Sequence, residues 1–541
     1  METKILKAVF FASFFLFVIF IFVNINWGEP FYFHPDERNI ASSISQLNFP
    51  KNLNPHFFAY GSLPIYLAFV LGSIPQIASN GLNNLIVDFS TAIILTRLAS
   101  ALFALLLIFL IFKTTELLAG KREAFLAGSL ASLSVAYIQF ANFGTFEMWL
   151  SFFSLLIIYL LLLFVKSGKD NFIVYSSIAF GILCSLKLSF IGLIPIFILA
   201  LLFGFKPKDK IAKKIFIFLL FILVSTMSYL VSSPFNLLDS QGFISSMNYE
   251  GSVALGTLPV FYTGTFFNTI PILYQYEKVL PFLINPLLTL ISIPSLIYLS
   301  YLSITKRNKL LGLVVFSFLI IFVSQSALFV KWTRYAVPSL SFLYILIAIF
   351  IFKIKDIING KIFNLIILFV LGVSFIYSIS YAKTVKLSQD TRIEALNFST
   401  KTIDKNSKIL SEVYDLGIVP FNSYYPHITL FNFYDLDNVD TSKKALSEEL
   451  NNSDYIIIPS QRIMQSRILD NSNFPNGNNF YKSLFADKLN YRKIYQTPCD
   501  IFCKITYMGD PVFNLEQTAS VFDRPTVFIF ENKKITNKNN K

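Results

Sequence analysis

Long apolar runs separated by short polar stretches dominate the first 382 residues. A membrane-spanning helix needs about 20 predominantly apolar residues. Runs of this kind lie near residues 7–24, 93–112, 124–141, 146–165, 171–185, 189–204, 213–231, 281–302, 310–330, 336–352 and 362–381. The pattern predicts a polytopic α-helical membrane protein with about 11 transmembrane helices. The first helix is predicted to be retained, because no small-residue cleavage site follows it.

Residues 62–79 form a further apolar stretch, but it contains two prolines. With eleven spans and a cytoplasmic N-terminus, the inner loops hold 18 lysines and arginines and the outer loops hold 6. This asymmetry follows the positive-inside rule, and a full span at 62–79 would invert every later loop. The stretch is therefore predicted to be a re-entrant or interfacial helix. Residues 25–92, the large loop 232–280 and everything after 382 then lie on the outer side.

The pattern changes near residue 383, where polar residues alternate with short apolar runs. Residues 454–459 and 526–532 resemble β-strands, and residues 443–451, just before the first of these runs, resemble a helix. This alternation predicts an α/β domain. We therefore expect a transmembrane domain over residues 1–382 and a C-terminal soluble extracytoplasmic α/β domain over 383–541, with a disordered end.

The composition supports a membrane protein. Hydrophobic residues make up 54% of the chain and charged residues 14%, whereas soluble domains average about 25% charged residues. The net charge of +13 comes largely from short loops, which indicates membrane orientation and no nucleic-acid binding. Of the three cysteines, Cys184 lies in an apolar segment, and Cys499 and Cys503 are close enough to pair in an oxidising compartment.

The stretch FHPDER, residues 33–38, follows the first apolar run. Proline and acidic residues suit the first turn of a helix, because the acids complement the helix dipole. An apolar stripe at helical spacing follows, formed by Ile40, Ile44 and Leu47. This predicts an amphipathic helix on the membrane surface. Asp36 and Glu37 could only cap this helix, or they could carry chemistry.

Other ionisable residues fall at the outer ends of predicted spans. Glu147 lies near the outer end of one of them, as a functional candidate or as a loop residue just outside the lipid. Lys187, between two spans, could extend to water or contact a phosphate. Lys331 and Arg334 lie beside tryptophan and tyrosine, as in interfacial belts, but on the side where positive charge is disfavoured. An anionic ligand would compensate for these positive charges, because lysine and arginine bind phosphate well. The carboxylates, in turn, suit a general base.

Several short motifs occur in order along the chain. They are FHPDE after the first span, NPHFFAYGSLPIYL (54–67), ILTRLASALFALLLIFLIFK (94–113), TFEMWLSFFSLLIIYLL, LKLSF, TRYAVPSLSFL and, in the tail, VFDRPTVFIF. Together they resemble the GT-C glycosyltransferases, in the branch that includes the protein O-mannosyltransferases and the aminoarabinose transferase of lipid A (glycosyltransferase family 39). The resemblance covers nearly the whole chain. It departs from the family in having Glu147 at a usual aspartate position and no lysine in YGSLP.

The resemblance implies the GT-C fold and inverting transfer of a sugar from a polyprenyl-phosphate donor. The acceptor would be a hydroxyl of a protein, lipid or envelope glycan on the outer face of the cell membrane. The expected catalytic carboxylates are Asp36, as general base, with Glu37 and Glu147. The expected phosphate-binding residues are Arg38, Lys187, Lys331 and Arg334. The substrate pocket is expected to include His34, His56, Tyr60, Tyr249 and Glu250.

Three questions stay open at this stage. Some GT-C enzymes need a divalent metal, but no metal-ligand spacing is visible, so no cofactor is certain; the candidate ligands are His34, Asp36, Glu37, Glu147 and His56. Residues 245–266 could be a mobile lid or a connector. The alternative functions are a non-catalytic lipid-linked sugar transporter or polymer-handling protein, and an inactive scaffold relative. Transporters tend to show internal repeats and paired broken helices, which we do not see in the sequence.

Overall fold

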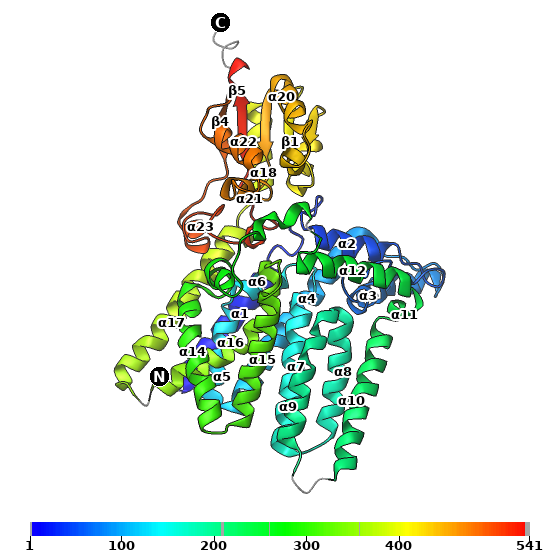
Figure 1. Ribbon diagram of the computed structural model, residues 1–541, viewed down its shortest axis with the longest axis vertical. Helices are drawn as coiled ribbons and strands as arrows, with labels where there is room; N and C mark the ends of the chain where they lie inside the picture. The colour runs from blue at the N-terminus through cyan, green and yellow to red at the C-terminus, as the bar shows by residue number, and fades with distance from the viewer. Residues whose placement is uncertain (1–2, 207–209, 259, 356, 536–541) are drawn as a thin grey trace. The chain divides into compact units, whose positions relative to one another are not determined.

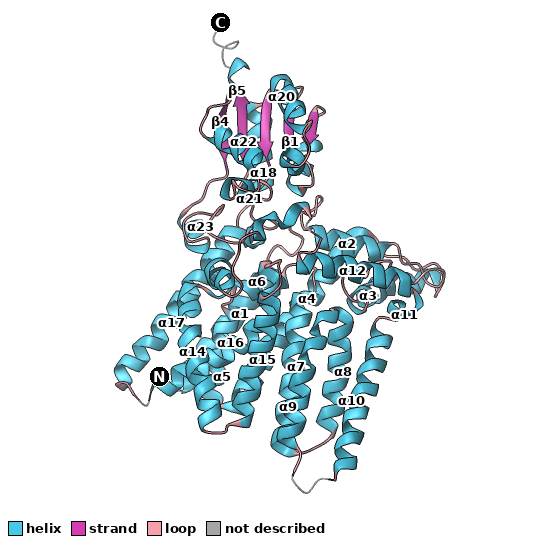
Figure 2. Ribbon diagram, in the orientation of Figure 1, coloured by secondary structure: helices cyan, strands magenta, loops and turns pink. Residues whose placement is uncertain are grey.

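The computed structural model describes residues 3–206, 210–258, 260–355 and 357–535. Two compact units make up the chain. Unit 1 comprises Met1–Ile25, Asp36–Leu258 and Ile270–Ile379, and unit 2 comprises Asn26–Pro35, Pro259–Thr269 and Ser380–Lys541. Unit 1 is built of helices, and the strands belong to unit 2 (Figures 1 and 2).

Unit 1 contains most of the helices. In chain order they are α1 (Thr3–Phe22), α2 (Pro35–Ser45), α3 (Leu63–Asn80), α4 (Phe89–Leu118), α5 (Lys121–Ser132), α6 (Val135–Ala141), α7 (Glu147–Ser167), α8 (Asn171–Leu186), η1 (Leu188–Leu193), α9 (Ile194–Gly204), α10 (Ile211–Ser232), α11 (Phe235–Leu238), α12 (Ser240–Leu255), η3 (Gln275–Val279), α13 (Leu280–Ile284), α14 (Pro286–Thr305), α15 (Lys309–Ser326), α16 (Thr333–Ile354) and α17 (Gly360–Tyr381).

Every predicted apolar run overlaps one helix or two consecutive helices. Within the described residues, 8 helices are long and apolar enough to cross a membrane, and α5 with α6 form a ninth candidate, bent by 56°. The segments over α8 and over η1 with α9 are shorter apolar helices. The polytopic helical class is therefore confirmed, and the number of eleven spans stays a prediction.

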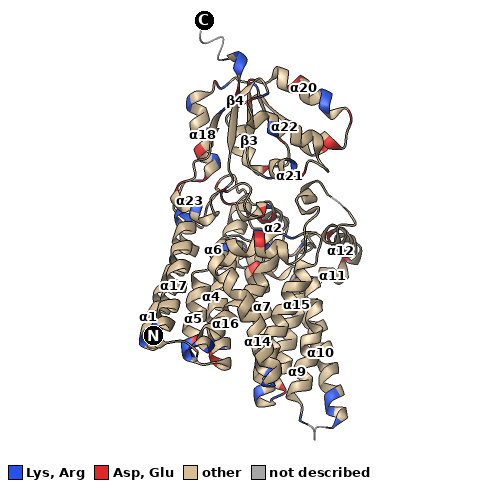
Figure 3. Ribbon diagram, turned by 60° about the vertical axis from the view of Figure 1, so that its left-hand side comes forward, with Lys and Arg blue, Asp and Glu red and all other residues tan. Residues whose placement is uncertain are grey.

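The helices of unit 1 differ in how much of their apolar surface faces protein. The apolar window of α16 is 83% buried, whereas that of α10 is 22% buried. Phe216 and Leu223 of α10 are more than half exposed, as expected for side chains that face lipid. At one end of α7, α8 and α10 lie α2, α3, α11 and α12 (Figure 1). The lysines and arginines of unit 1 gather mainly at the opposite end (Figure 3).

Unit 2 is an α/β unit around a sheet of five short strands. Its elements are η2 (Phe261–Phe266), η4 (Ala382–Lys386), α18 (Thr391–Thr402), β1 (Ile409–Glu412), η5 (Leu416–Ile418), α19 (Val419–Asn422), β2 (Ile428–Phe431), η6 (Phe433–Asp437), α20 (Ser442–Asn452), β3 (Tyr455–Ile458), α21 (Met464–Leu469), α22 (Pro475–Phe485), β4 (Tyr491–Gln496), α23 (Ile501–Thr506), η7 (Gln517–Ala519) and β5 (Phe528–Asn532). The strand order is β2-β1-β3-β5-β4; β1 is parallel to β2 and β3, and β5 is antiparallel to β3 and β4.

Both faces of this sheet are covered, because alternate strand residues point to opposite sides. Ile456 and Phe530 contribute to one buried cluster, with residues of α20, α21 and α22. Ile457 and Ile529 contribute to the other, with residues of α18 and α19. The predicted α/β character of the tail is confirmed. Unit 2 also includes two segments of the loops that were predicted to be outer, 26–35 and 259–269, and the hydropathy pattern does not set these segments apart.

Candidate functional site

Helix α2 presents the carboxylate of Asp36. Pro35 begins the helix, and the predicted apolar stripe is fully buried at Ile40 and Ile44. An oxygen of Asp36 accepts hydrogen bonds from the Nη1 of Arg334 and, at 3.3 Å, from the hydroxyl of Tyr60. The side chain of Asp36 is 22% exposed and that of Arg334 is 24% exposed. The buried stripe thus fixes the helix and leaves this ion pair accessible to a ligand.

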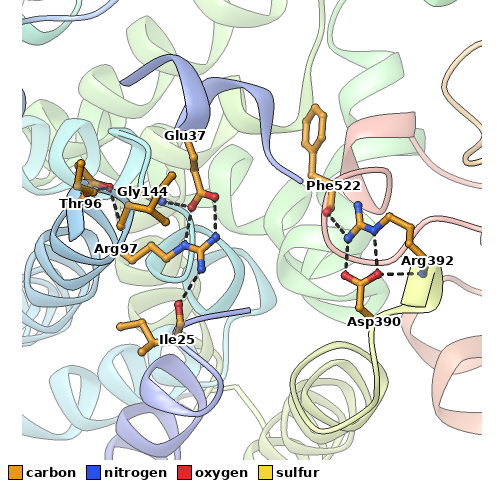
Figure 4. Close-up of polar contacts among 10 residues, drawn as sticks. Ile25, Glu37, Thr96, Arg97, Gly144, Asp390, Arg392 and Phe522 are labelled. Atoms are coloured by element: carbon orange, nitrogen blue, oxygen red, sulfur yellow. Dashed lines mark hydrogen bonds and ion pairs between the residues drawn. The ribbon is translucent and has the colours of Figure 1, made fainter. Parts of the chain in front are cut away.

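Glu37, one residue later, has a different environment. Its carboxylate and the guanidinium of Arg97 on α4 are both completely buried and form a two-point ion pair, with N–O distances of 2.9 and 2.7 Å (Figure 4). The amide of Gly144 also donates to Glu37, at 2.6 Å. This arrangement gives Glu37 the role of an anchor that holds α2 against α4, and its expected catalytic role stays a prediction without a geometric basis.

The loop before α3 brings Tyr60 and Lys187 to the same place. The amide of Gly61 donates to the carbonyl of Leu186 at 3.1 Å, and Lys187 is the next residue, at the end of α8. The Nζ of Lys187 lies 3.9 Å from the centroid of the Tyr335 ring. Burial raises the pKa of Tyr60 well above its usual value, against the lowering effect of Arg334. Tyr60 is therefore a neutral hydrogen-bond donor here.

Gly61 makes this close approach possible. A Cβ at this position would lie 2.1 Å from the carbonyl oxygen of Ser185, which is backbone and cannot rotate away. We expect Gly61→Ala to displace Tyr60 from Asp36 and to lower kcat/KM at least about tenfold in the sugar transfer that the motif resemblance implies, because small misplacements beside a reacting group are costly. Gly192→Ala is the matched control, since a Cβ there meets nothing within 4 Å. Equal activity of the two variants in a transfer assay would contradict this prediction.

Glu147 and Glu250 are the remaining carboxylates near Lys187. Glu147 is the first residue of α7 and is 3% exposed, and its Oε2 has no hydrogen-bond partner among the described residues. Lys187 interacts electrostatically with Arg334, Glu147, Glu250 and Asp36. Partial burial raises the pKa of Glu250 on α12, and Arg334 and Lys187 oppose this shift. We call these residues, with Tyr60, the Asp36 cluster: Asp36, Tyr60, Glu147, Lys187, Glu250 and Arg334.

Helix α12 is tied to the segment that carries Arg334. The carbonyl of Ala254 accepts from the amides of Phe329 at 3.0 Å and Val330 at 3.4 Å. A Cβ at Gly256 would lie 2.6 Å from the ring of Phe329, so the end of α12 lies close against this segment. The segment that begins at residue 245, for which the sequence left a mobile lid or a connector open, thus starts as part of a regular helix, and no observation decides between the two.

The other predicted site residues have different neighbours. Arg38 lies 5.9 Å from the Phe89 ring centroid, and the Nζ of Lys331 donates to the carbonyl of Phe329 at 2.9 Å. His56 is 59% exposed and lies 3.7 Å from Asp239. Tyr249 is 45% exposed. His34 belongs to unit 2.

Two residues of the site were not predicted. Tyr335 supplies the ring against Lys187, and Arg97 supplies the partner of Glu37. Both stand in quoted motifs, Tyr335 directly after Arg334 and Arg97 as the arginine of the second span, and these motifs were the available signal.

The candidate metal ligands do not gather into a metal site. Among the described residues, no group of three or more histidine, cysteine, aspartate or glutamate side chains could hold a metal ion. Asp36 and Glu37, although adjacent, are bound to different arginines. The donor set therefore does not fit a divalent metal, and no step below uses one.

Comparison with known proteins agrees with this architecture. Residues 84–231 match the family described as "Dolichyl-phosphate-mannose-protein mannosyltransferase". The oligosaccharyltransferase AglB from Archaeoglobus fulgidus, in complex with an inhibitory peptide and a dolichol-phosphate, superposes with a TM-score of 0.54 at 12% identity, covering 97% of this chain and 88% of that chain. The apo form gives 0.53 at 13% identity with the same coverage. The chain has the GT-C fold.

The resemblance predicted from the ordered motifs is thereby confirmed. ArnT from Cupriavidus metallidurans, bound to undecaprenyl phosphate, is 14% identical over 97% of both chains, with a TM-score of 0.42. A comparison with curated protein sequences gives no match. Within this fold, the Asp36 cluster combines the carboxylates of Asp36, Glu147 and Glu250 with the cations Lys187 and Arg334.

Proposed function

We propose that the protein is an integral-membrane glycosyltransferase that moves a sugar from a polyprenyl-phosphate donor to an acceptor hydroxyl, with inversion. The observation that carries this proposal is the contact between Asp36 and Arg334, with Lys187 in electrostatic range of both. One cluster thus contains a general base and cations for a leaving phosphate. The matched family is described by a lipid-phosphate sugar donor, which supports the same donor class.

In the proposed reaction Asp36 takes the proton of the acceptor hydroxyl. The acceptor oxygen attacks the anomeric carbon from the face opposite the phosphate, and the bond between that carbon and the phosphate oxygen breaks. The polyprenyl phosphate leaves with the electron pair. Cations directed at this developing charge lower the barrier.

Arg334 links the two halves of this reaction. Its Nη1 is bonded to Asp36, and its buried Nε has no hydrogen-bond partner among the described residues. A donor phosphate that bonds to the guanidinium would share it with Asp36 and so bring the leaving group beside the base. Arginine suits this role because its planar fork can contact two oxygen atoms at once.

The test is transfer by the purified protein in lipid nanodiscs. Polyprenyl-phosphate sugars are offered with peptide, lipid and glycan acceptors, and transfer and donor hydrolysis are measured, together with mass spectrometry for bound polyprenyl phosphate. Consumption of a donor supports the proposal. Failure to bind polyprenyl phosphate and to consume any donor would overturn it, and binding without turnover would favour a transporter.

Lys187 is expected to make donor binding pH-dependent. Burial lowers the pKa of Lys187 to about 8, and the charge of Arg334 adds to this effect, whereas nearby carboxylates oppose it. As the pH rises through 8 the free enzyme loses the charge of Lys187, so KM for the donor should increase about tenfold per pH unit above it. Lys187→Arg should move this increase to higher pH, because arginine stays protonated. A donor KM that does not change between pH 7 and 9.5 would exclude Lys187 as a phosphate ligand.

We further propose that the cluster and unit 2 face the extracytoplasmic side. The positive-inside asymmetry of the loops supports this, as does the disulfide Cys499–Cys503, since disulfides persist in oxidising compartments. In a Cys184→Ser background, a membrane-impermeant maleimide added to intact cells should label unit 2 only after reduction. Labelling that requires cell lysis would contradict the orientation.

A further inference from the structure

Residues 26–35 belong to unit 2, whereas Ile25 before them and Asp36 after them belong to unit 1. The guanidinium of Arg97 binds the chain on both sides of this segment. The Nη1 of Arg97 donates to the carbonyl of Ile25 at 2.8 Å, and its Nε and Nη2 hold the carboxylate of Glu37 (Figure 4). Loops of about 6–16 residues whose ends lie together are Ω-loops. The segment is therefore a loop of this kind, and Arg97 fixes its neck within unit 1.

A second buried arginine holds the end of the same loop within unit 2. The guanidinium of Arg392 lies 3.7 Å from the ring centroid of Phe33. It is bound by the carboxylate of Asp390 at 2.8 and 2.6 Å and by the carbonyl of Phe522 at 2.9 Å (Figure 4). The ring of His34 lies 4.4 Å from that of Phe522. Since Arg392 is 1% exposed and held on several sides, it offers Phe33 a fixed contact.

The tail motif VFDRP supports this contact. The carboxylate of Asp523 accepts from the hydroxyl of Tyr381 at 2.7 Å. The Nη2 of Arg524 donates to the carbonyl of Pro498 at 2.6 Å. The carbonyl of Pro525 accepts from the hydroxyl of Thr391, the neighbour of Arg392, at 2.8 Å. Residues 522–525 of this motif thus form hydrogen bonds that stabilise the part of unit 2 which Phe33 and His34 contact.

We propose that Arg392 is a positioning residue for Asp36, and that unit 2 holds the N-terminal side of the helix start which presents this carboxylate. The chain is fixed by Arg392 at Phe33 and by Arg97 at Glu37, and Asp36 lies between these two anchors. Release of one anchor frees the backbone before Asp36 while the other stays in place. The inference rests on the proposed role of Asp36 as the base. A misplacement of about 1 Å can cost up to about a hundredfold in rate.

The test compares Arg392→Met with Arg492→Met. Arg492 also donates twice to one carboxylate in unit 2, that of Glu531 at 2.9 and 2.7 Å, but it belongs to β4 and not to this contact. We expect Arg392→Met to lower kcat about tenfold with donor KM changed by less than about twofold, because the phosphate cations are untouched. Arg492→Met should behave as the wild type, and Arg392→Lys should recover part of kcat.

A second variant and a second measurement guard against misfolding of unit 2. Phe33→Ala removes the ring and leaves the bonds of Arg392 in place, and it should lower kcat in the same way. Hydrogen exchange of the amides of residues 31–34 should become faster in both variants, while exchange in β1 stays unchanged. Wild-type kcat in Arg392→Met or Phe33→Ala, or an equal loss of kcat in Arg492→Met, would overturn this inference and leave the proposed function standing. Absence of transfer by the wild-type chain would instead overturn the proposed function.

Discussion

Asp36→Asn is expected to lower the rate of sugar transfer by about 10²–10⁴-fold while the protein stays folded. The asparagine has nearly the same shape and its oxygen can still accept bonds from Tyr60 and Arg334, but it cannot take a proton. General base catalysis contributes about 10²–10⁴-fold, so kcat should fall by about this factor. Transfer from a labelled polyprenyl-phosphate sugar by the purified variant in nanodiscs is the measurement.

Asp239→Asn provides the control for this substitution. Asp239 is a carboxylate of the predicted outer loop 232–280, and Asn54 and His56 are its partners, so its replacement should leave transfer nearly unchanged. Binding of polyprenyl phosphate should persist in Asp36→Asn, since Lys187 and Arg334 are retained. Transfer at the wild-type rate by Asp36→Asn would exclude it as the base and would leave Glu147 and Glu250 as the remaining carboxylates of the cluster.

The helices could be predicted from the sequence because each depends on a local pattern. The apolar runs gave the membrane helices, and the stripe at Ile40 and Ile44 gave α2. Residues 454–459 and 526–532 coincide with β3 and β5. The association of segments 26–35 and 259–269 with unit 2 depends on contacts between positions far apart in the chain, and hydropathy carries no information about such contacts.

The site was predictable in part for the same reason. Charges at the outer ends of spans were expected to meet, and Asp36, Lys187 and Arg334 do so. Adjacent residues of a helix point about 100° apart, so Asp36 and Glu37 cannot share a partner easily. Local sequence does not say which of the two faces the cluster. Only the packing of α2 against α4 decides that Glu37 faces Arg97.

Arg97 and Arg334 therefore perform different tasks with similar chemistry. The first is fully buried and satisfied by Glu37 and the carbonyl of Ile25, which suits a permanent anchor. The second is partly exposed and keeps an unused donor, which suits a ligand. Burial and the remaining hydrogen-bonding capacity thus distinguish the anchor Arg97 from Arg334, the proposed phosphate ligand, although both lie in the N-terminal halves of their helices.

Glu37→Gln and Arg97→Met are each expected to destabilise the protein by about 3–5 kcal/mol, because either change leaves a charge buried without its partner. The double variant should lose less unfolding free energy than the two single variants together, since the second replacement removes the unpaired charge. Unfolding of the purified variants in mixed micelles, followed by circular dichroism, measures these free energies. The folded fraction of Glu37→Gln should keep more transfer activity than Asp36→Asn.

The matched control is the ion pair Lys113–Glu116 on the same helix as Arg97. Its side chains are 40% and 25% exposed and its N–O distance is 3.0 Å, so Lys113→Met should cost only about 0–1 kcal/mol. Comparable losses for Lys113→Met and Arg97→Met would show that the pair with Glu37 is no special anchor. Loss of transfer in Glu37→Gln as complete as in Asp36→Asn, at unchanged stability, would instead give Glu37 the catalytic role that its sequence position first indicated.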